Sequence, residues 1–165
     1  MNPTKDICFE PIGIIHTEFQ QPAGTPIQPA AAEGHTGSVE VFDQYTECLD
    51  GLDGFSHIFL IYFLHQVKSF KPRVTPFLGN RETGLFSTRA PVRPNPIGLS
   101  VVEISGIDGN IISIKNPDML EGTPLLDIKP YVFEIDSYRS TRHGWIEESM
   151  PGFFDRRADD RFVGE

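Results

Sequence analysis

The stretch from residue 84 to residue 131 carries two dense motifs, TRAPVRPNPIGLS at residues 88–100 and DMLEGTPLLDIKPY at residues 118–131. Pro91, Pro94 and Pro96 fix their own φ angles and disfavour helical conformation in the residues before them. The first motif is therefore predicted to be a rigid, polar, non-helical loop. Such a loop loses little entropy on gripping a ligand, which favours a binding element, although a proline-braced connection with solvated arginines would have the same sequence.

The segments beside the two motifs have the composition of β-strands. Leu85–Arg89 is expected to be a strand that leads into the proline loop. Leu99–Ile104 and Ile111–Lys115 are rich in β-branched residues, and the turn-forming sequence GIDGN between them predicts a hairpin. Tyr131–Ile135 is expected to form a further strand.

The N-terminal half continues this pattern. Strands are predicted at Ile12–His16 and Gly37–Phe42, and a longer, central one at His57–Gln66, which is a run of mostly apolar residues. The loop over residues 20–37 contains three prolines and is long enough to have a functional role, and Tyr45–Leu52 indicates a turn or two of helix. Six or seven strands with little helical periodicity predict a mainly β domain, either a barrel or a sandwich.

Composition predicts an ordered domain outside the membrane. The 165 residues are 39% apolar and lack an apolar run of the roughly 18 residues that a membrane-spanning helix needs. The first residues are too polar for a signal peptide, so a cytoplasmic protein is expected. Cys8 and Cys48 are expected to be reduced and buried, since their spacing suits neither a metal site nor a disulfide framework. The domain is expected to span residues 1–138, with a tail at 139–165 that docks on it or on a partner subunit.

The net charge of −9 argues against a nucleic-acid binder, but the charge is unevenly distributed. Residues 1–67 carry one lysine against nine carboxylates, whereas residues 68–133 carry eight basic groups against six acidic ones. A solubilising basic loop would give the same distribution as a phosphate-binding patch. The candidate RNA contacts in this middle part are Lys68, Lys71, Arg73 and Arg93.

The residue types of the motifs favour binding of a polar ligand over hydrolysis or metal binding. Ser100 lacks the sequence context of a nucleophile elbow. His57 and His65 lie eight residues apart on one predicted strand, which is too far for a shared metal ion. The motifs instead offer guanidinium, amide, carboxylate and backbone groups, which suit a nucleotide-like or amino-acid-like ligand among others.

Three strings closely resemble the TrmO-like (TsaA-domain, YaeB-like) family of S-adenosylmethionine-dependent tRNA methyltransferases: GLFSTR at residues 84–89, RPNPIGLS at 93–100 and EGTPLLDIKPY at 121–131. The resemblance implies a small β-barrel with few short helices, a methyltransferase fold other than the Rossmann fold. It also implies a homodimer and S-adenosylmethionine as the cofactor. The implied reaction is methylation of the N6 nitrogen of threonylcarbamoyladenosine next to the tRNA anticodon.

The resemblance also implies which residues contact the cofactor. By matching position these are Gln28, Pro29, Ala30, His65, Gln66, Arg89, Leu99, Lys115, Asn116, Pro117 and Asp118. Amide and backbone groups suit the adenine edge, Arg89 suits the methionine carboxylate, and Asp118 suits a cationic or ribose-bearing group. No metal is implied.

Direct in-line methyl transfer is the expected mechanism, with the protein positioning donor and acceptor. The acceptor nitrogen belongs to a urea-like unit, so the loss of its proton needs assistance. Asp127 and Tyr131 are the candidate catalytic residues for this role. The segment that contains them, DIKPY at residues 127–131, is alternatively a clamp that braces the pocket or a dimer.

The methyl acceptor stays open at the level of the sequence. Longer tRNA-acting relatives carry an additional C-terminal region that helps to grip RNA, whereas this sequence ends at Glu165 after an acidic tail. A tRNA adenine-N6 methyltransferase is expected. The alternatives are an S-adenosylmethionine-binding module, a methyltransferase for a smaller acceptor, and an interaction protein with a vestigial pocket.

Overall fold

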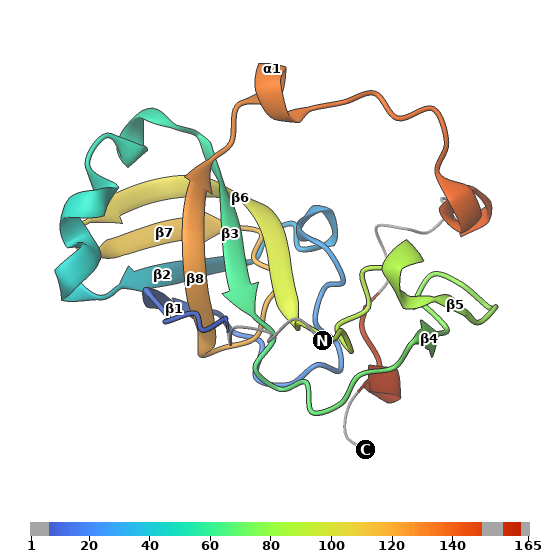
Figure 1. The fold of residues 1–165 in the computed structure, drawn as a ribbon. Coiled ribbons are helices and arrows are strands. Elements are labelled where there is room, and N and C mark those ends of the chain that lie inside the picture. The colour runs from blue at the N-terminus through green and yellow to red at the C-terminus, as the bar shows by residue number, and fades with distance from the viewer. Residues whose placement is uncertain (1–6, 150–156, 163–165) are drawn as a thin grey trace.

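Six antiparallel strands close into a barrel in the order β1-β2-β7-β6-β3-β8 in the computed structural model, which describes residues 7–149 and 157–162 (Figure 1). The strands are β1 Gly13–His16, β2 Thr36–Val41, β3 His57–Phe63, β6 Ile97–Asp108, β7 Ile111–Lys115 and β8 Thr123–Pro130. A two-stranded ribbon of β4, Arg73–Val74, and β5, Thr83–Gly84, lies to one side of the barrel. The predicted mainly β barrel is confirmed.

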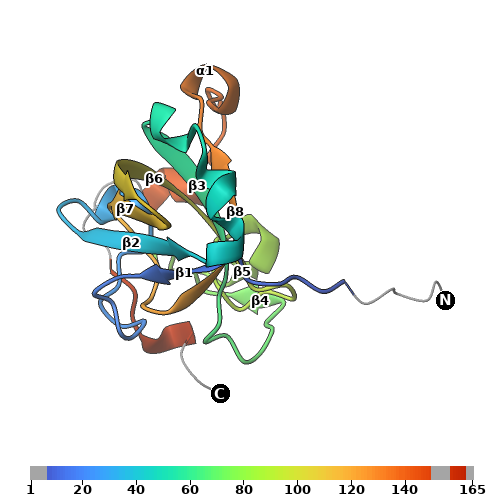
Figure 2. The ribbon, with the colours of Figure 1, turned by 90° about the vertical axis from the view of Figure 1, so that its left-hand side faces the viewer.

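Helical structure is short and lies outside the barrel wall. The α-helix α1, Phe133–Asp136, is a single turn that projects beyond the barrel in both views (Figure 1 and Figure 2). The 3-10 helices are Pro29–Ala31, Asp43–Leu49, Leu52–Gly54, Leu85–Ser87, Gly144–Ser149 and Asp160–Phe162. None of the described helices is long and apolar enough to cross a membrane.

Aliphatic side chains fill the barrel because alternate residues of each strand point inward. Along β3 the buried positions are Ile58, Leu60 and Tyr62, while Phe63 at the end of the strand is 39% exposed. The apolar run of β3 is therefore buried on one face and not on both. The other fully buried core side chains include Ile15, Val39, Ile112, Ile114 and Leu125.

Gly98 allows β3 and β6 to approach closely at one end of the barrel. It lies opposite Tyr62 in the strand register, and a Cβ atom at position 98 would stand 2.1 Å from Cε2 of the Tyr62 ring. A side chain at this position would displace the ring, so the glycine keeps Tyr62 against the backbone of β6.

Two predicted strands are wrong. Leu85–Arg89 begins with the 3-10 turn Leu85–Ser87, because the hydroxyls of Ser87 and Thr88 donate to the carbonyls of Gly84 and Leu85 and compete with strand pairing. The last strand is β8, which ends before Tyr131. The chain then turns into α1, where the N–H of Val132 donates to Asp136 Oδ2 at 2.7 Å.

Two smaller predictions also need correction. The hairpin of β6 and β7 exists, but β6 runs through most of the predicted turn, and the reversal occurs at Gly109, which has a positive φ of 59°. Cys8 and Cys48 are free, as expected, but both are exposed and not buried.

A loop region packs beside the barrel and has a small core of its own. Val74, Leu85, Ala90 and Val92 are buried together, and Phe162 of the C-terminal segment packs against them. The chain reaches this region after α1 by passing back over the loop side of the molecule (Figure 1). Segments far apart in the sequence thus meet at one end of the barrel.

Candidate functional site

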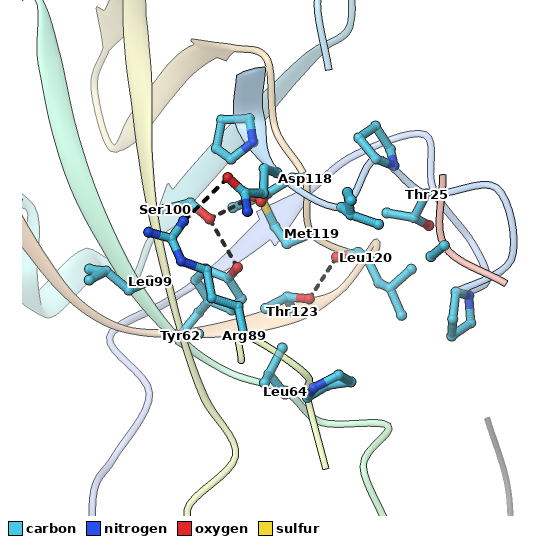
Figure 3. A pocket seen from close by; sticks show the side chains of 18 of the residues that line it. Thr25, Tyr62, Leu64, Arg89, Leu99, Ser100, Asp118, Met119, Leu120 and Thr123 are labelled. Atoms are coloured by element: carbon cyan, nitrogen blue, oxygen red, sulfur yellow. Dashed lines mark hydrogen bonds between the residues drawn. The ribbon is translucent and has the colours of Figure 1, made fainter. Parts of the chain in front are cut away.

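A pocket of about 760 Å³ lies between the barrel and the loop region, a size typical of small-molecule sites. Its floor comes from β3 and β6, and its walls come from loops (Figure 3). The wall segments fall within residues 22–30, 64–67, 88–93, 118–123 and 158–162.

A row of hydrogen-bonded polar groups lies at the barrel side of the pocket, where Tyr62 and Ser100 are buried and Asp118 is partly buried. Tyr62 Oη is 3.0 Å from Ser100 Oγ, and Ser100 Oγ donates to Asp118 Oδ1 at 2.6 Å (Figure 3). Burial raises the pKa of Asp118 to about 6, although the Ser100 hydrogen bond and the charge of Arg89 oppose the shift. Burial and the Asp118 carboxylate also raise the pKa of Tyr62, which therefore stays protonated.

Arg89 brings a positive charge to the same region of the pocket. Its Nη1 donates to Oε1 of Gln28 at 3.3 Å, so two loops 61 residues apart in sequence meet here (Figure 3). Arg93 also lines the pocket, but its Nη1 donates to the carbonyls of Thr88 and Ala90. Arg93 therefore braces the proline loop from within.

The turn before β8 forms another wall. Thr123 is buried, and its hydroxyl donates to the carbonyl of Leu120 at 2.7 Å and lies 3.5 Å from Nδ1 of His65. Met119 is buried beneath this turn. The turn therefore contributes Leu120 and Thr123 to the pocket lining, beside His65 from the segment after β3.

The C-terminal segment at residues 157–162 closes the outer side of the pocket. The backbone of Ala158 pairs with Gly24 and Thr25 through two hydrogen bonds of 2.9 Å. Arg161 binds Asp159 at 2.6 Å and donates to the carbonyl of Pro76 at 3.0 Å. These contacts connect the loop at residues 22–30 with the loop at residues 75–77.

The structure brings together most of the cofactor contacts that the sequence suggested. The predicted residues that line the pocket are Gln28, Pro29, Ala30, His65, Gln66, Arg89, Arg93, Leu99 and Asp118. The predicted residues outside the lining are Lys68, Lys71, Arg73, Lys115, Asn116, Pro117, Asp127 and Tyr131.

The segment before Asp118 turns away from the pocket. Lys115 lies on the outside of the barrel, where its Nζ is 2.6 Å from Glu103, and the N–H of Asn116 donates to the carbonyl of His35. Pro117 is fully buried. The residues that line the pocket here are Asp118, Met119 and Leu120, so the lining segment begins three residues after the start of the predicted one.

Asp127 faces outward because of a register shift in β8. Leu125 pairs with Tyr62, but Asp127 pairs with Ile61, so the irregularity between them reverses the orientation of the strand faces. Asp127 is 2.7 Å from Lys129 on this exposed face. Tyr131 packs against Phe59 with ring centroids 5.4 Å apart and reaches the pocket only through that ring.

The basic loop is not gathered at the pocket mouth. Arg73 pairs with Glu82 at 3.0 Å on the exposed β4–β5 ribbon, and the N–H of Lys71 donates to the carbonyl of Val92. Among residues 7–149 and 157–162, no group of three or more histidine, cysteine, aspartate or glutamate side chains is placed to hold a metal ion.

Sequence reasoning missed several residues that the pocket needs. Tyr62 and Ser100 occupy inward positions of β3 and β6, where the neighbouring inward residues are aliphatic or glycine. Strand alternation alone predicts which positions point inward, so a hydroxyl-bearing residue at such a position is a detectable sign of a functional side chain. The contribution of Ala158 and Phe162 had no comparable signal.

Known proteins resemble both the sequence and the fold. The sequence profile of the tRNA-methyltransferase O N-terminal domain matches residues 14–137. The chain is 48% identical to a probable S-adenosyl-L-methionine-binding protein of Pyrococcus abyssi, over 94% of this chain and 85% of that protein. It is 36% identical to a tRNA (adenine(37)-N6)-methyltransferase of Rattus norvegicus, over 90% of this chain but 37% of that protein.

A solved structure resembles the fold with a similar difference in length. The crystal structure of TrmO from Pseudomonas aeruginosa matches with a TM-score of 0.71 at 35% identity, over 84% of this chain and 62% of that one. The chain thus spans most of the archaeal relative, and less than two thirds of the rat and Pseudomonas proteins.

Proposed function

The chain belongs to the family of the tRNA-methyltransferase O N-terminal domain, and from this premise we propose that it is an S-adenosylmethionine-dependent methyltransferase that acts on tRNA. One observation supports the proposal above the others. Arg89 and Asp118 place a guanidinium and a partly buried carboxylate in one pocket of about 760 Å³. Opposite charges in one enclosed space complement the carboxylate and the cationic groups of such a cofactor.

The residues of the pocket fit the parts of this cofactor. Arg89 would hold the methionine carboxylate, and Asp118 would face positive charge. Gln28, His65 and Gln66 offer amide, imidazole and backbone groups to the adenine edge. The cofactor supplies a methyl group already activated on a sulfonium, so the task of the chain is to position donor and acceptor and to exclude water.

The acceptor in this proposal is the N6 nitrogen of threonylcarbamoyladenosine next to the anticodon. The name of the rat relative supports an adenine-N6 acceptor. Lys68, Lys71, Arg73 and Arg93 are proposed RNA contacts, with the weakest support for Arg93, whose guanidinium is occupied within its own loop. A cytoplasmic homodimer belongs to the same proposal.

A second function has its own support. The chain covers 85% and 95% of two archaeal relatives named as probable S-adenosyl-L-methionine-binding proteins, but 37% of the rat tRNA methyltransferase. A module that binds the cofactor, or that methylates a smaller acceptor, would need no further RNA-binding region.

Methyl transfer from radiolabelled S-adenosylmethionine to total tRNA tests the first function. We expect label in nucleosides derived from threonylcarbamoyladenosine. Arg89→Ala should weaken cofactor binding by about tenfold or more, because a hydrogen bond to a charged group contributes about 1.5–3 kcal/mol. The matched control is Arg73→Ala, which removes an arginine from the exposed ribbon outside the pocket.

The outcomes separate the two functions. Cofactor binding that Arg89→Ala weakens, without any labelled tRNA, would favour the module. Absence of cofactor binding by the unmodified protein, measured by calorimetry, would contradict both functions.

A further inference from the structure

The hydrogen bonds among Tyr62, Ser100 and Asp118 have a fixed direction. A serine hydroxyl has one hydrogen, and Ser100 donates it to Asp118 Oδ1 at 2.6 Å. The contact of 3.0 Å between Tyr62 and Ser100 therefore has Tyr62 as its donor. All three side chains line the pocket, and the donors run from Tyr62 through Ser100 to the carboxylate of Asp118 (Figure 3).

The surroundings of Asp118 suit a carboxyl group that gains and loses a proton. The side chains that interact electrostatically with it are Tyr62, which is titratable, and Arg89, which is positively charged. Burial raises the pKa of Asp118 to about 6, which places its protonation close to neutral pH. Asp159, another carboxylate of the pocket lining, is committed to Arg161, and this contact holds the pKa of Asp159 below its usual range.

We propose that Asp118 is the proton acceptor of the methyl transfer, and that Tyr62 and Ser100 form the hydrogen-bonded path to it. The inference rests on the proposed function and deepens it. The two earlier candidates are less well placed, because Asp127 faces outward and Tyr131 lies behind Phe59.

The step balances in atoms and electrons. The acceptor nitrogen forms a bond to the methyl carbon while the carbon–sulfur bond breaks, and that electron pair remains on sulfur as a neutral thioether. The nitrogen releases its proton to Tyr62 Oη, Tyr62 passes its own proton to Ser100 Oγ, and Ser100 passes its proton to Asp118. Both hydroxyls end neutral, and Asp118 ends as a carboxylic acid.

Electrostatics favours this order of events. Before transfer, the positive sulfonium stabilises the ionised form of Asp118. Transfer removes that positive charge and leaves a partly buried carboxylate with less compensation, which raises its proton affinity at the moment when a proton must be accepted. The net charge of the pocket is therefore the same before and after the step.

Proton release on ligand binding tests the charge coupling without any turnover. Titration calorimetry at about pH 6, in two buffers of different ionisation enthalpy, should show that S-adenosylmethionine releases up to about half a proton from a half-protonated carboxyl. Its neutral-sulfur product, S-adenosylhomocysteine, should release fewer protons. Asp118→Asn should abolish the difference between the two ligands, and the matched control Asp127→Asn should keep it. An unchanged difference in Asp118→Asn would overturn the proposal.

Single-turnover methyl transfer to tRNA tests the path. Asp118→Asn should lower the rate by about 100-fold or more and remove the fall in rate below about pH 6. Ser100→Ala and Tyr62→Phe should slow transfer while leaving the affinity for S-adenosylmethionine within about twofold, since neither substitution removes the carboxylate. Wild-type rates in both variants would overturn the path.

Controls separate this proposal from the function on which it rests. Asp118→Asn replaces a partly buried carboxyl by a neutral group of the same shape, so its melting temperature at about pH 8 should be no lower than that of the wild type. Labelled tRNA with an unchanged pH profile in Asp118→Asn would contradict the proton acceptor alone. If the wild type binds cofactor and labels no tRNA, the proposed tRNA function fails, while the calorimetric comparison still reports on Asp118.

Discussion

The barrel and the loop region that faces it are held together in different ways. The barrel has continuous strand pairing and a core of fully buried aliphatic residues. The loop region has a four-residue core and depends on individual contacts, such as those of Arg93 with its own loop and of Arg161 with Pro76. Strand pairing is cooperative, whereas single contacts allow local opening, so the two regions should differ in stability.

The polar groups of the pocket come from both regions, some from the barrel and some from the loops. Tyr62 and Ser100 belong to barrel strands, whose geometry is fixed by pairing on both sides. Arg89 and Gln28 belong to loops. The two hydroxyls of the proposed proton path thus lie on the rigid barrel, whereas Asp118, where that path ends, and the groups that grip the ligand lie on loops that can open to admit it.

Matched leucine truncations should produce the largest difference between the regions. Leu60→Ala removes a fully buried barrel side chain and should lower the free energy of unfolding by about 2–5 kcal/mol in urea titration. Leu85→Ala truncates the loop core. It should raise amide exchange in residues 64–96 while leaving the amides of β2 and β7 protected at the wild-type level.

The opposite result would show that the two regions are not independent in stability. If Leu85→Ala lowered protection of β2 and β7 as much as Leu60→Ala does, the loops and the barrel would unfold as one cooperative unit.

The sequence predicts the barrel better than it predicts the region beside it. A β-branched run identifies the strand near Ile12–His16, alternation identifies the one near Gly37–Phe42, and turn residues identify the hairpin, because these signals are local. Strand pairing in β8 depends on partners 60 or more residues away in β3. Its limits, and the shift that turns Asp127 outward, have no local signal.

The residues of the candidate site likewise include some that the sequence predicts and some that it does not. Arg89, Gln28 and His65 follow from the family resemblance, since loops that bind ligands carry recognisable motifs. Strand alternation predicts that Ser100 points into the barrel, where a hydroxyl group is unusual. Ala158 in the wall at residues 157–162 is placed by backbone pairing with Gly24 and Thr25, to which side-chain identity contributes little, so its place in the pocket has no sequence signal.

Removal of Arg161 should have an intermediate effect that is confined to the loop side. Its guanidinium connects Asp159, the carbonyl of Pro76 and the ring of Phe77, which is 5.1 Å away. Arg161→Ala should weaken S-adenosylmethionine binding by about fivefold to tenfold, equivalent to about 1–1.4 kcal/mol, as measured by calorimetry. The free energy of unfolding should change by less than about 1 kcal/mol.

Arg73→Ala is the control for charge, since it removes an arginine outside the pocket lining. Equal affinities in both variants and the wild type would show that the C-terminal segment does not contribute to the pocket. A large loss of global stability in Arg161→Ala would show that the loop side supports the barrel.

The smallest expected effect lies where the two regions join. His16, at the end of β1, is 2.8 Å from Glu121, and Glu121 also accepts the N–H of Thr17 at 2.7 Å, so this carboxylate ties the barrel to the pocket turn. The hydrogen bond with Glu121 raises the pKa of His16. Partial burial opposes the change at Glu121, but the hydrogen bonds of His16 and Thr17 hold its pKa below the usual value.

The signs of these shifts define a pH window. The stabilisation from His16 is complete below its usual pKa of 6.5 and is lost as pH rises through the raised pKa. The stabilisation from Glu121 is complete above its usual pKa of 4.5 and is lost as pH falls through the lowered pKa. The pair therefore contributes most between these two values.

Glu121→Gln tests the window because the amide oxygen can still accept the Thr17 hydrogen bond. Urea unfolding should show a loss of less than about 1 kcal/mol at about pH 5.5, because both side chains are about one third exposed, and a smaller loss at about pH 8.5. Negligible losses at both pH values would mean that the Thr17 contact, which the amide keeps, and not the charge of His16, joins the barrel to the turn. The junction would then depend on backbone geometry, as the C-terminal wall does.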